Sequence, residues 1–324
     1  MKKKLRVVFS GTPDFARICL EHLLNCGVDV ALVVTAPDRK KGRGQQVAAP
    51  PVKLCAMEHG LPILQPPNLK DKEFLDKVAS YHPDIGVVVA FRMMPEALWN
   101  MPELGTINLH ASLLPDYRGA APINWVLING DKKTGLTTFF LKHQIDTGDI
   151  ILQEEVEIRD EMDAGQLHDI LARKGAELLF RTLEKVSEGQ HEGRSQDSLL
   201  NGKESIHQAP KIFKDDCRID WNQDARSVHN LIRGLSPYPG AWTTIVSGND
   251  KKLSLKIFKT ALTGIDSRGK EGKILLGEDG GIYIGTGDEF LSVAKLQLEG
   301  RQVMDTPAFL RGYRELLLTQ KHLT

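Results

Sequence analysis

The sequence lacks three features that would each indicate a class of protein. No apolar run approaches the ~18 residues of a transmembrane helix, so we expect no membrane-spanning segment. The four cysteines form no C-x-x-C pair and no close His/Cys group has zinc-ligand spacing, so we expect no metal site and a reducing, cytoplasmic setting. An excess of charge is also absent, because 42 Lys and Arg balance 42 Asp and Glu. A nucleic-acid partner would therefore need a local basic patch.

The first part of the chain alternates short apolar runs with helical patterns. Strands are predicted at residues 5–10, 28–35, 84–90 and 105–109. Alternation of this kind indicates the α/β class, in which helices cover a mainly parallel sheet. A long helix is predicted over 163–188, with Asp163 and Gln166 as its start signal and Gly189 as its end. We therefore expect a Rossmann-like domain over residues 1–189.

The rest of the chain has a different pattern. Residues 190–209 are polar, follow neither the helical nor the strand period, and are predicted to be an exposed linker. A helix is predicted at 224–235, and Thr306-Pro307 suits the cap and first turn of a final helix. Between them, short β-like runs lie near 241–246, 253–258, 272–276, 281–285 and 290–298. These runs predict a small β-barrel domain over residues 210–324.

The strongest chemical signal lies in residues 105–123. Asn108 and His110 are two apart at the end of a predicted strand, so their side chains share one face at the sheet's carboxyl edge. An Asn and a His there can donate hydrogen bonds to an oxygen that gains charge during acyl transfer to an amine. Asp146 follows in a predicted turn and can orient His110 or pass on a proton. Each residue alone fits a structural role equally well, as a strand-end cap or an ordinary turn.

Two other motifs suggest activities that the rest of the sequence does not support. The loop Ser10–Pro13 joins a strand to a helix, as dinucleotide-binding loops do, but G-x-G-x-x-G is absent and Pro13 removes an N–H donor. The tripeptide Asp-Thr-Gly at residue 146 also occurs in aspartic proteases. Those enzymes need two such carboxylates in an all-β fold, whereas this one stands alone in an α/β pattern.

Taken together, the motifs N-x-H-x-S-L-L-P, Y-R-G-A-A-P-I and I-D-T-G-D resemble the folate-dependent formyltransferases. The motifs G-T-P-D-F-A, P-D-R-K-K-G-R-G and P-Y-P-G-A-W extend the resemblance over nearly the whole chain, towards members that act on initiator methionyl-tRNA. The resemblance implies a Rossmann-like domain that binds 10-formyltetrahydrofolate and an OB-type barrel that helps to hold the tRNA. It also implies that Asn108 and His110 stabilise the oxyanion, and that Asp146 orients His110. We expect a monomer.

The resemblance further implies a set of folate-contacting residues. One loop matches the family pattern and contains Ser112, Leu113, Leu114 and Pro115, and Ile145 flanks Asp146 in the same cavity. Two departures lie near the expected pterin pocket. Phe91-Arg92 replaces a Tyr-Gly of the relatives, and Gln144-Ile145 replaces a Gly-Leu. We expect Phe91 and Arg92 to contact the folate as well.

A basic stretch follows the second predicted strand and contains Arg39, Lys40, Lys41 and Arg43. Such a charge run is usually a solvated surface, but the family counterpart contacts tRNA, so we expect these residues to bind RNA phosphates. The rival functions are formyl transfer to glycinamide ribonucleotide or a sugar nucleotide, hydrolysis of formyl-folate, and RNA binding without catalysis. Glycinamide ribonucleotide formyltransferases are normally much shorter and lack the barrel, and the sugar-nucleotide and hydrolase rivals give the basic stretch no role. The intact catalytic trio argues against a silent RNA-binding module.

Overall fold

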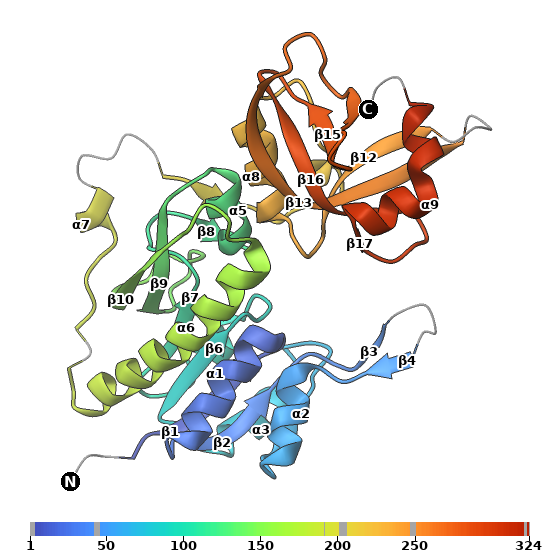
Figure 1. The fold of residues 1–324 in the computed structure, drawn as a ribbon. Helices are drawn as coiled ribbons and strands as arrows, with labels where there is room; N and C mark the ends of the chain where they lie inside the picture. The colour runs from blue at the N-terminus through green and yellow to red at the C-terminus, as the bar shows by residue number, and fades with distance from the viewer. Residues whose placement is uncertain are drawn as a thin grey trace. The chain divides into compact units, whose positions relative to one another are not determined.

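The structure is a computed structural model. It describes residues 4–41, 46–190, 192–200, 206–246, 251–320 and Leu323, apart from the side chains of Lys40, Lys41 and Gln46. The chain forms two compact units whose segments interleave along the sequence (Figure 1). The first contains Met1–Gly119, Lys133–Glu157 and His168–Gln208, and the second contains Ala120–Lys132, Ile158–Leu167 and Ala209–Thr324. The domain limits expected from the sequence, 1–189, 190–209 and 210–324, stay a prediction.

A seven-stranded sheet forms the core of the first unit, in the order β10-β9-β7-β6-β1-β2-β5. The central strands are parallel, and β9 and β10 are antiparallel at one edge. This arrangement confirms the predicted α/β class. The strands are β1 Arg6–Gly11, β2 Asp29–Val34, β5 Ile63–Leu64, β6 Ile85–Val89, β7 Thr106–His110, β9 Lys133–Phe140 and β10 Ile150–Glu157. A separate hairpin contains β3 Arg39–Lys41 and β4 Gln46–Ala48, and the short strand β8 covers Arg118–Gly119.

The helices of this unit are α1 Asp14–Asn25, α2 Pro51–Glu58, α3 Lys72–Ala79, α4 Glu96–Trp99 and α7 Asp197–Leu200, together with most of α6 Ala164–Ser187. Helices α1 and α3 bury apolar residues along one face, whereas the short α7 buries none of its residues. Gly175 lets α6 approach β7, since a Cβ at that position would lie 2.9 Å from Cδ2 of Leu109. The predicted start of α6 is confirmed. Asp163 and Gln166 each accept a hydrogen bond from the other's main-chain N–H, at 2.9 and 3.1 Å.

The described part of 190–209 contains structure that its composition does not indicate. Arg194 and Ile150 exchange two main-chain hydrogen bonds of 2.8 and 2.9 Å, α7 follows, and β11 covers Gln208–Ala209. Gln196 is only 2% exposed. A polar sequence therefore does not keep this side chain in solvent.

An antiparallel sheet forms most of the second unit, in the order β12-β13-β16-β15-β14, with β17 on β16. Its strands are β12 Ala241–Val246, β13 Lys252–Asp266, β14 Ile274–Leu276, β15 Ile282–Gly285, β16 Glu289–Leu298 and β17 Met304–Asp305. Strand β13 is longer than the predicted 253–258, because it follows β16 through several register shifts. The unit also contains α5 Pro122–Ile128, η1 Asp215–Cys217, α8 Ala225–Gly234 and α9 Thr306–Leu318.

The helix caps of this unit are local hydrogen bonds. Asp224 accepts from the N–H of Ser227 at 2.9 Å, so α8 begins where the sequence predicts. The predicted cap of α9 was wrong by one residue. Asp305 accepts from the N–H of Ala308 at 2.8 Å, whereas Thr306 is the first helical residue and its hydroxyl donates to a strand carbonyl.

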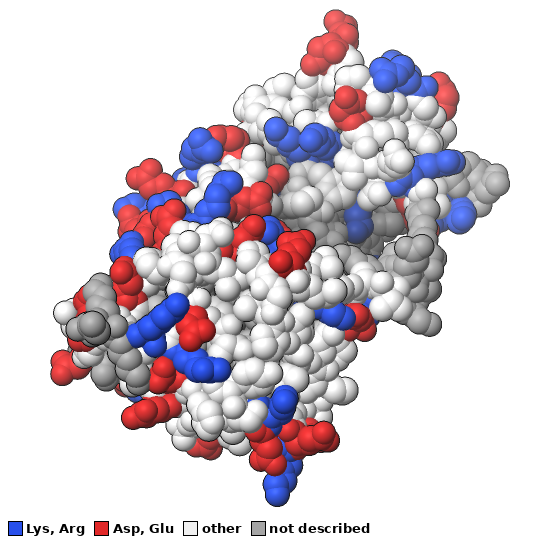
Figure 2. All heavy atoms as spheres, turned by 90° about the horizontal axis from the view of Figure 1, so that it is seen from below, with Lys and Arg blue, Asp and Glu red and all other residues white. Residues whose placement is uncertain are grey.

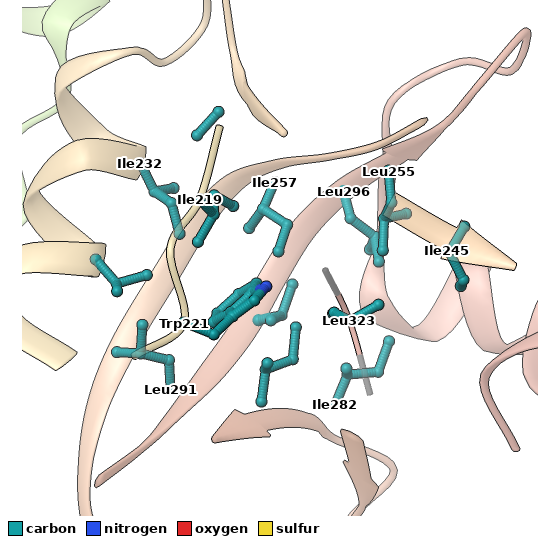
Figure 3. Close-up of a cluster of buried hydrophobic side chains, with 14 of the residues drawn as sticks. Ile219, Trp221, Ile232, Ile245, Leu255, Ile257, Ile282, Leu291, Leu296 and Leu323 are labelled. Atoms are coloured by element: carbon teal, nitrogen blue, oxygen red, sulfur yellow. The ribbon is translucent and has the colours of Figure 1, made fainter. Parts of the chain in front are cut away.

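Trp221 lies at the centre of the apolar core of the second unit (Figure 3). It is 4% exposed, and its Nε1 donates a 3.1 Å hydrogen bond to the hydroxyl of Thr243. The ring therefore fills the core with its polar atom satisfied. Of the helices that the structure describes, none is long and apolar enough to cross a membrane.

Candidate active site

His110 and Asp146 meet at the carboxyl edge of the first sheet. His110 is the last residue of β7, and Asp146 lies in the loop 141–149 between β9 and β10. Nδ1 of His110 is 3.8 Å from Oδ2 of Asp146, and the two side chains are 8% and 11% exposed. That separation exceeds a hydrogen bond, but in a site shielded from water it is short enough for strong attraction between opposite charges.

The second ring nitrogen of His110 is held by the main chain. Nε2 lies 2.8 Å from the carbonyl oxygen of Tyr117. Because a carbonyl only accepts, Nε2 carries the hydrogen, and Nδ1 of the neutral ring has a free lone pair on the side of Asp146. A proton taken up at Nδ1 would therefore create a positive charge beside a carboxylate.

Asn108 supplies a polar group on the same face of β7. It pairs in register with Val88 of β6 and Phe139 of β9, two residues before His110. Its half-buried amide has no hydrogen-bond partner among the residues that the structure describes. The amide N–H groups are thus available to an oxygen of a bound substrate.

The loop that carries Asp146 has a tightly specified shape. Asp146 has a φ of +54°, in the left-handed region that Asp tolerates better than most residues. Its Oδ2 accepts a 3.0 Å hydrogen bond from the N–H of Gly119. Gly148 cannot be replaced without movement, since a Cβ there would lie 1.6 Å from the carbonyl oxygen of Phe140.

The loop 111–117, predicted to contact folate, is fastened to the neighbouring strands. The hydroxyl of Thr137 donates to the Ser112 carbonyl at 2.7 Å and accepts from the Leu114 N–H at 3.1 Å. Gln153 donates to the Leu114 carbonyl at 2.9 Å. The Ser112 hydroxyl donates to the Asp116 carbonyl at 2.7 Å. The main chain of this loop is therefore held in one conformation.

The side chains of the predicted folate residues differ in exposure. Leu114 and Pro115 are buried, with Leu114 in a small apolar cluster, and Leu113 is half-buried over Gly135. Ile145, beside Asp146, is 60% exposed. Folate contact by these residues and by Ser112 stays a prediction.

Phe91 and Arg92 are held by the segment before α3 and by the core. Phe91 packs against an apolar cluster, and the guanidinium of Arg92 donates to the carbonyls of Pro66 and Pro67. Burial, together with the nearby charge of Arg39, lowers the pKa of Arg92. In the part of the chain that is described, no carboxylate pairs with Arg92. Folate contact by Phe91 and Arg92 stays a prediction.

The described part of the basic stretch lies in β3, which pairs with β4. Arg39 begins β3 and is exposed, and Lys40 and Lys41 complete that strand. Arg43 lies outside the described residues. Contact of all four with RNA stays a prediction.

Thr137, Gln153 and Gln196 support the site without any sequence pattern that indicates them. Their bonds join positions far apart in the chain, so only the fold brings the partners together. Tyr117 and Arg118 also support the site, and the motif that contains them indicates no role for either. In the described ranges, no group of three or more His, Cys, Asp or Glu could hold a metal ion.

Comparisons with known proteins agree with this geometry. A family model described as "Formyl transferase" matches residues 3–183, and one described as "Formyl transferase, C-terminal domain" matches residues 211–314. The chain belongs to the formyl transferase family.

Relatives of this formyl transferase share nearly its full length. It is 45% identical over 316 residues to the methionyl-tRNA formyltransferase of Parabacteroides distasonis, covering 97% of this chain and 98% of the relative. It is 47% identical over 314 residues to the methionyl-tRNA formyltransferase of Phocaeicola vulgatus, covering 97% of each.

Solved structures share the fold at much lower identity. WlaRD, a sugar 3N-formyl transferase, superposes with a TM-score of 0.63 at 17% identity, over 92% of this chain and 99% of WlaRD. HypX from Aquifex aeolicus, solved with tetrahydrofolic acid, gives a TM-score of 0.62 at 18% identity over 98% of this chain. The chain spans about half the length of HypX, at 48%. These likenesses show the fold alone.

Proposed function

We propose that this formyl transferase moves the formyl group of 10-formyltetrahydrofolate to the α-amine of initiator methionyl-tRNA. The observation that carries the proposal is the His110–Asp146 pair, 3.8 Å apart and nearly buried beside the free amide of Asn108. The full-length relatives that bear this enzyme name support the choice of acceptor.

The geometry supports an addition–elimination mechanism. The unprotonated amine attacks the formyl carbon, a C–N bond forms, and the formyl oxygen gains negative charge. The Asn108 amide donates to that oxygen. The family resemblance implies that His110 also stabilises the oxyanion, but its Nε2–H is directed to the Tyr117 carbonyl, so we assign its Nδ1 to accept the proton that the amine loses. Asp146 stabilises the resulting imidazolium. The bond from the formyl carbon to the folate nitrogen then breaks, and that nitrogen receives the proton from His110.

Local basic and aromatic groups support an RNA acceptor. On the face drawn in Figure 2, cations and anions are interspersed, so phosphate binding must be local. In the second unit, Lys214 and Arg218 lie 5.6 and 5.9 Å from the ring centre of Trp242. Cations beside an aromatic ring suit a nucleic acid with its phosphates and bases. In the first unit the β3–β4 hairpin supplies Arg39.

An acceptor competition tests the proposal. The enzyme is given 10-formyltetrahydrofolate with initiator methionyl-tRNA, glycinamide ribonucleotide, a sugar-nucleotide amine or no acceptor. We expect formyl-methionyl-tRNA to form fastest. Faster formylation of a small amine, or equally fast hydrolysis without acceptor, would assign the rival activity. Binding of tRNA with no folate turnover would leave only the RNA-binding module.

Two finer expectations stay predictions: action as a monomer and a cytoplasmic location. All four cysteines are free in the structure, which supports a reducing compartment. Sedimentation of the purified enzyme measures its oligomeric state, and fractionation of cells measures its location.

A further inference from the structure

Gln196 is a buried amide with every hydrogen-bonding position in use. It is 2% exposed and precedes α7. Its Nε2 donates to the carbonyls of Asp146 and Gly148, both at 2.9 Å. Its Oε1 accepts from Nε and Nη2 of Arg118, at 3.1 and 2.6 Å. One side chain thus contacts the main chain of Asp146, 50 residues earlier, and the guanidinium of Arg118, 78 residues earlier.

We propose that Gln196 is a positioning residue for formyl transfer and acts through Asp146. It does so by holding the main chain of the Asp146 turn so that the carboxylate faces His110. The role rests on the proposed function, because it assumes that the His110–Asp146 pair performs the transfer. Gln196 itself is placed against the main chain of the turn and is not a catalytic residue.

The turn needs this support because of its conformation. Asp146 has a left-handed φ of +54°, and only surrounding contacts keep a residue other than glycine there. The carbonyls at both ends of the short segment 146–148 point to the same amide of Gln196. Without that amide, two carbonyls and the Arg118 guanidinium would lose a buried partner, at a cost that favours rearrangement of the loop.

The contacts of Gln196 belong to a closed ring of bonds that includes the Asp146 carboxylate. Gln196 holds the main chain of Asp146, and Gly119 donates to Oδ2 of Asp146 at 3.0 Å. Arg118, next to Gly119 in the sequence, donates to Oε1 of Gln196. Tyr117, one residue earlier, accepts from Nε2 of His110 at 2.8 Å. Gln196 therefore holds Asp146 directly and through Arg118 and Gly119, whereas His110 is held by Tyr117.

The main chain just before Gln196 is fixed by hydrogen bonds. Two residues earlier, Arg194 exchanges main-chain hydrogen bonds with Ile150 at 2.8 and 2.9 Å. Ile150 begins β10, directly after the loop that carries Asp146. The side chain is thus anchored to the same strand that ends the loop, which limits how far it can move.

Two variants separate the contacts of Gln196. Gln196→Leu removes all of them, whereas Gln196→Glu keeps an acceptor for Arg118 but loses both donors to the turn. In steady-state formylation of methionyl-tRNA we expect kcat to fall about 10- to 100-fold in both, with the folate KM unchanged within about twofold. The matched control is Ser198→Ala, which removes a 2.7 Å bond to the Ser195 carbonyl in the same segment and should leave kcat unchanged.

A second measurement does not depend on catalysis. Hydrogen exchange at the N–H of Gly119 reports its bond to the Asp146 carboxylate, and we expect it to accelerate at least about tenfold in Gln196→Glu. Gln196→Glu is the variant to use if Gln196→Leu does not fold. Wild-type kcat together with wild-type protection of Gly119 in a folded variant would overturn the proposal. A wild-type enzyme that formylates no methionyl-tRNA would instead contradict the proposed function, and the exchange result would still decide whether Gln196 positions Asp146.

Discussion

Two loops meet at the carboxyl edge of the sheet, and they are fastened in different ways. The loop 111–117, predicted to bind folate, is held by Thr137 and Gln153 of the adjacent strands β9 and β10. The loop 141–149, which carries Asp146, is held by Gln196 from beyond α6. The sheet thus fixes the first part of the loop 111–117, whose end at Asp116 and Tyr117 also bonds to His207. The turn that carries Asp146 depends instead on the single side chain of Gln196 from a remote segment. Donor binding and turnover should therefore respond to different mutations.

The largest effect on kcat is expected for Asn108 and His110 at the end of β7, beside both loops. His110→Ala or Asn108→Ala should lower kcat by about 10²–10³-fold, because each removes a group used mainly in the transition state. Steady-state formylation measures the loss, and circular dichroism checks that the variants fold. Turnover near that of the wild type in either folded variant would remove the residue from the mechanism.

The next prediction concerns the negative charge of Asp146 in the loop 141–149. Asp146→Asn keeps the volume and an oxygen that can accept from Gly119, but it loses the carboxylate that stabilises a protonated His110. We expect kcat to fall about 10- to 100-fold while the affinity for folate stays within about twofold. Single-turnover rates measure the fall in turnover, and equilibrium binding measures the affinity for folate. If the variant unfolds, the carboxylate is needed for structure.

A third prediction contrasts both loops with the basic hairpin. Neutralising Lys40, Lys41 and Arg43 together should lower kcat/KM for tRNA about tenfold at low salt and flatten its salt dependence, because up to about three phosphate contacts disappear. Folate binding should not change. Neutralising the exposed cations Lys70, Lys72 and Lys77 alters the net charge equally and is the matched control. Unchanged tRNA use at both low and high salt would make the hairpin a solvated surface.

The sequence predicts those parts of the molecule that depend on local interactions. The strand Ile85–Val89 is buried at every position, so a continuous apolar run was enough to predict it. The start of α6 depends on a reciprocal bond between residues three apart, which the pair Asp163 and Gln166 indicates. The paired His110 and Asp146 could be expected only through the family motifs, because each residue alone also fits a structural role.

The residues that the sequence did not predict depend on distant partners. Gln196 lies in a polar stretch that resembles a linker, and it is buried because two carbonyls and an arginine surround it. The length of β13 likewise depends on its pairing with β16 through register shifts that no local pattern shows. Side-chain polarity reports what a residue can bond to, and only the fold determines which partners it meets.

The smallest effect is expected in the loop 111–117, which is predicted to bind folate. Thr137→Val keeps the shape but removes the hydroxyl that bonds Ser112 and Leu114, so the loop loosens. We expect the folate KM to rise severalfold with kcat within about twofold, and the free energy of unfolding to fall by about 1–3 kcal/mol. Steady-state kinetics and urea unfolding measure these changes. A large fall in kcat with unchanged KM would mean that the two loops do not divide binding from turnover.

A double-mutant cycle of Asp146→Asn and Gln196→Leu, measured by single-turnover formylation of methionyl-tRNA, tests the account most directly. If Gln196 acts only by positioning the Asp146 carboxylate, the double variant should be no slower than Asp146→Asn alone, within about twofold. If the two losses instead multiply, Gln196 contributes by another route, and the account of how the second loop supports formyl transfer is contradicted.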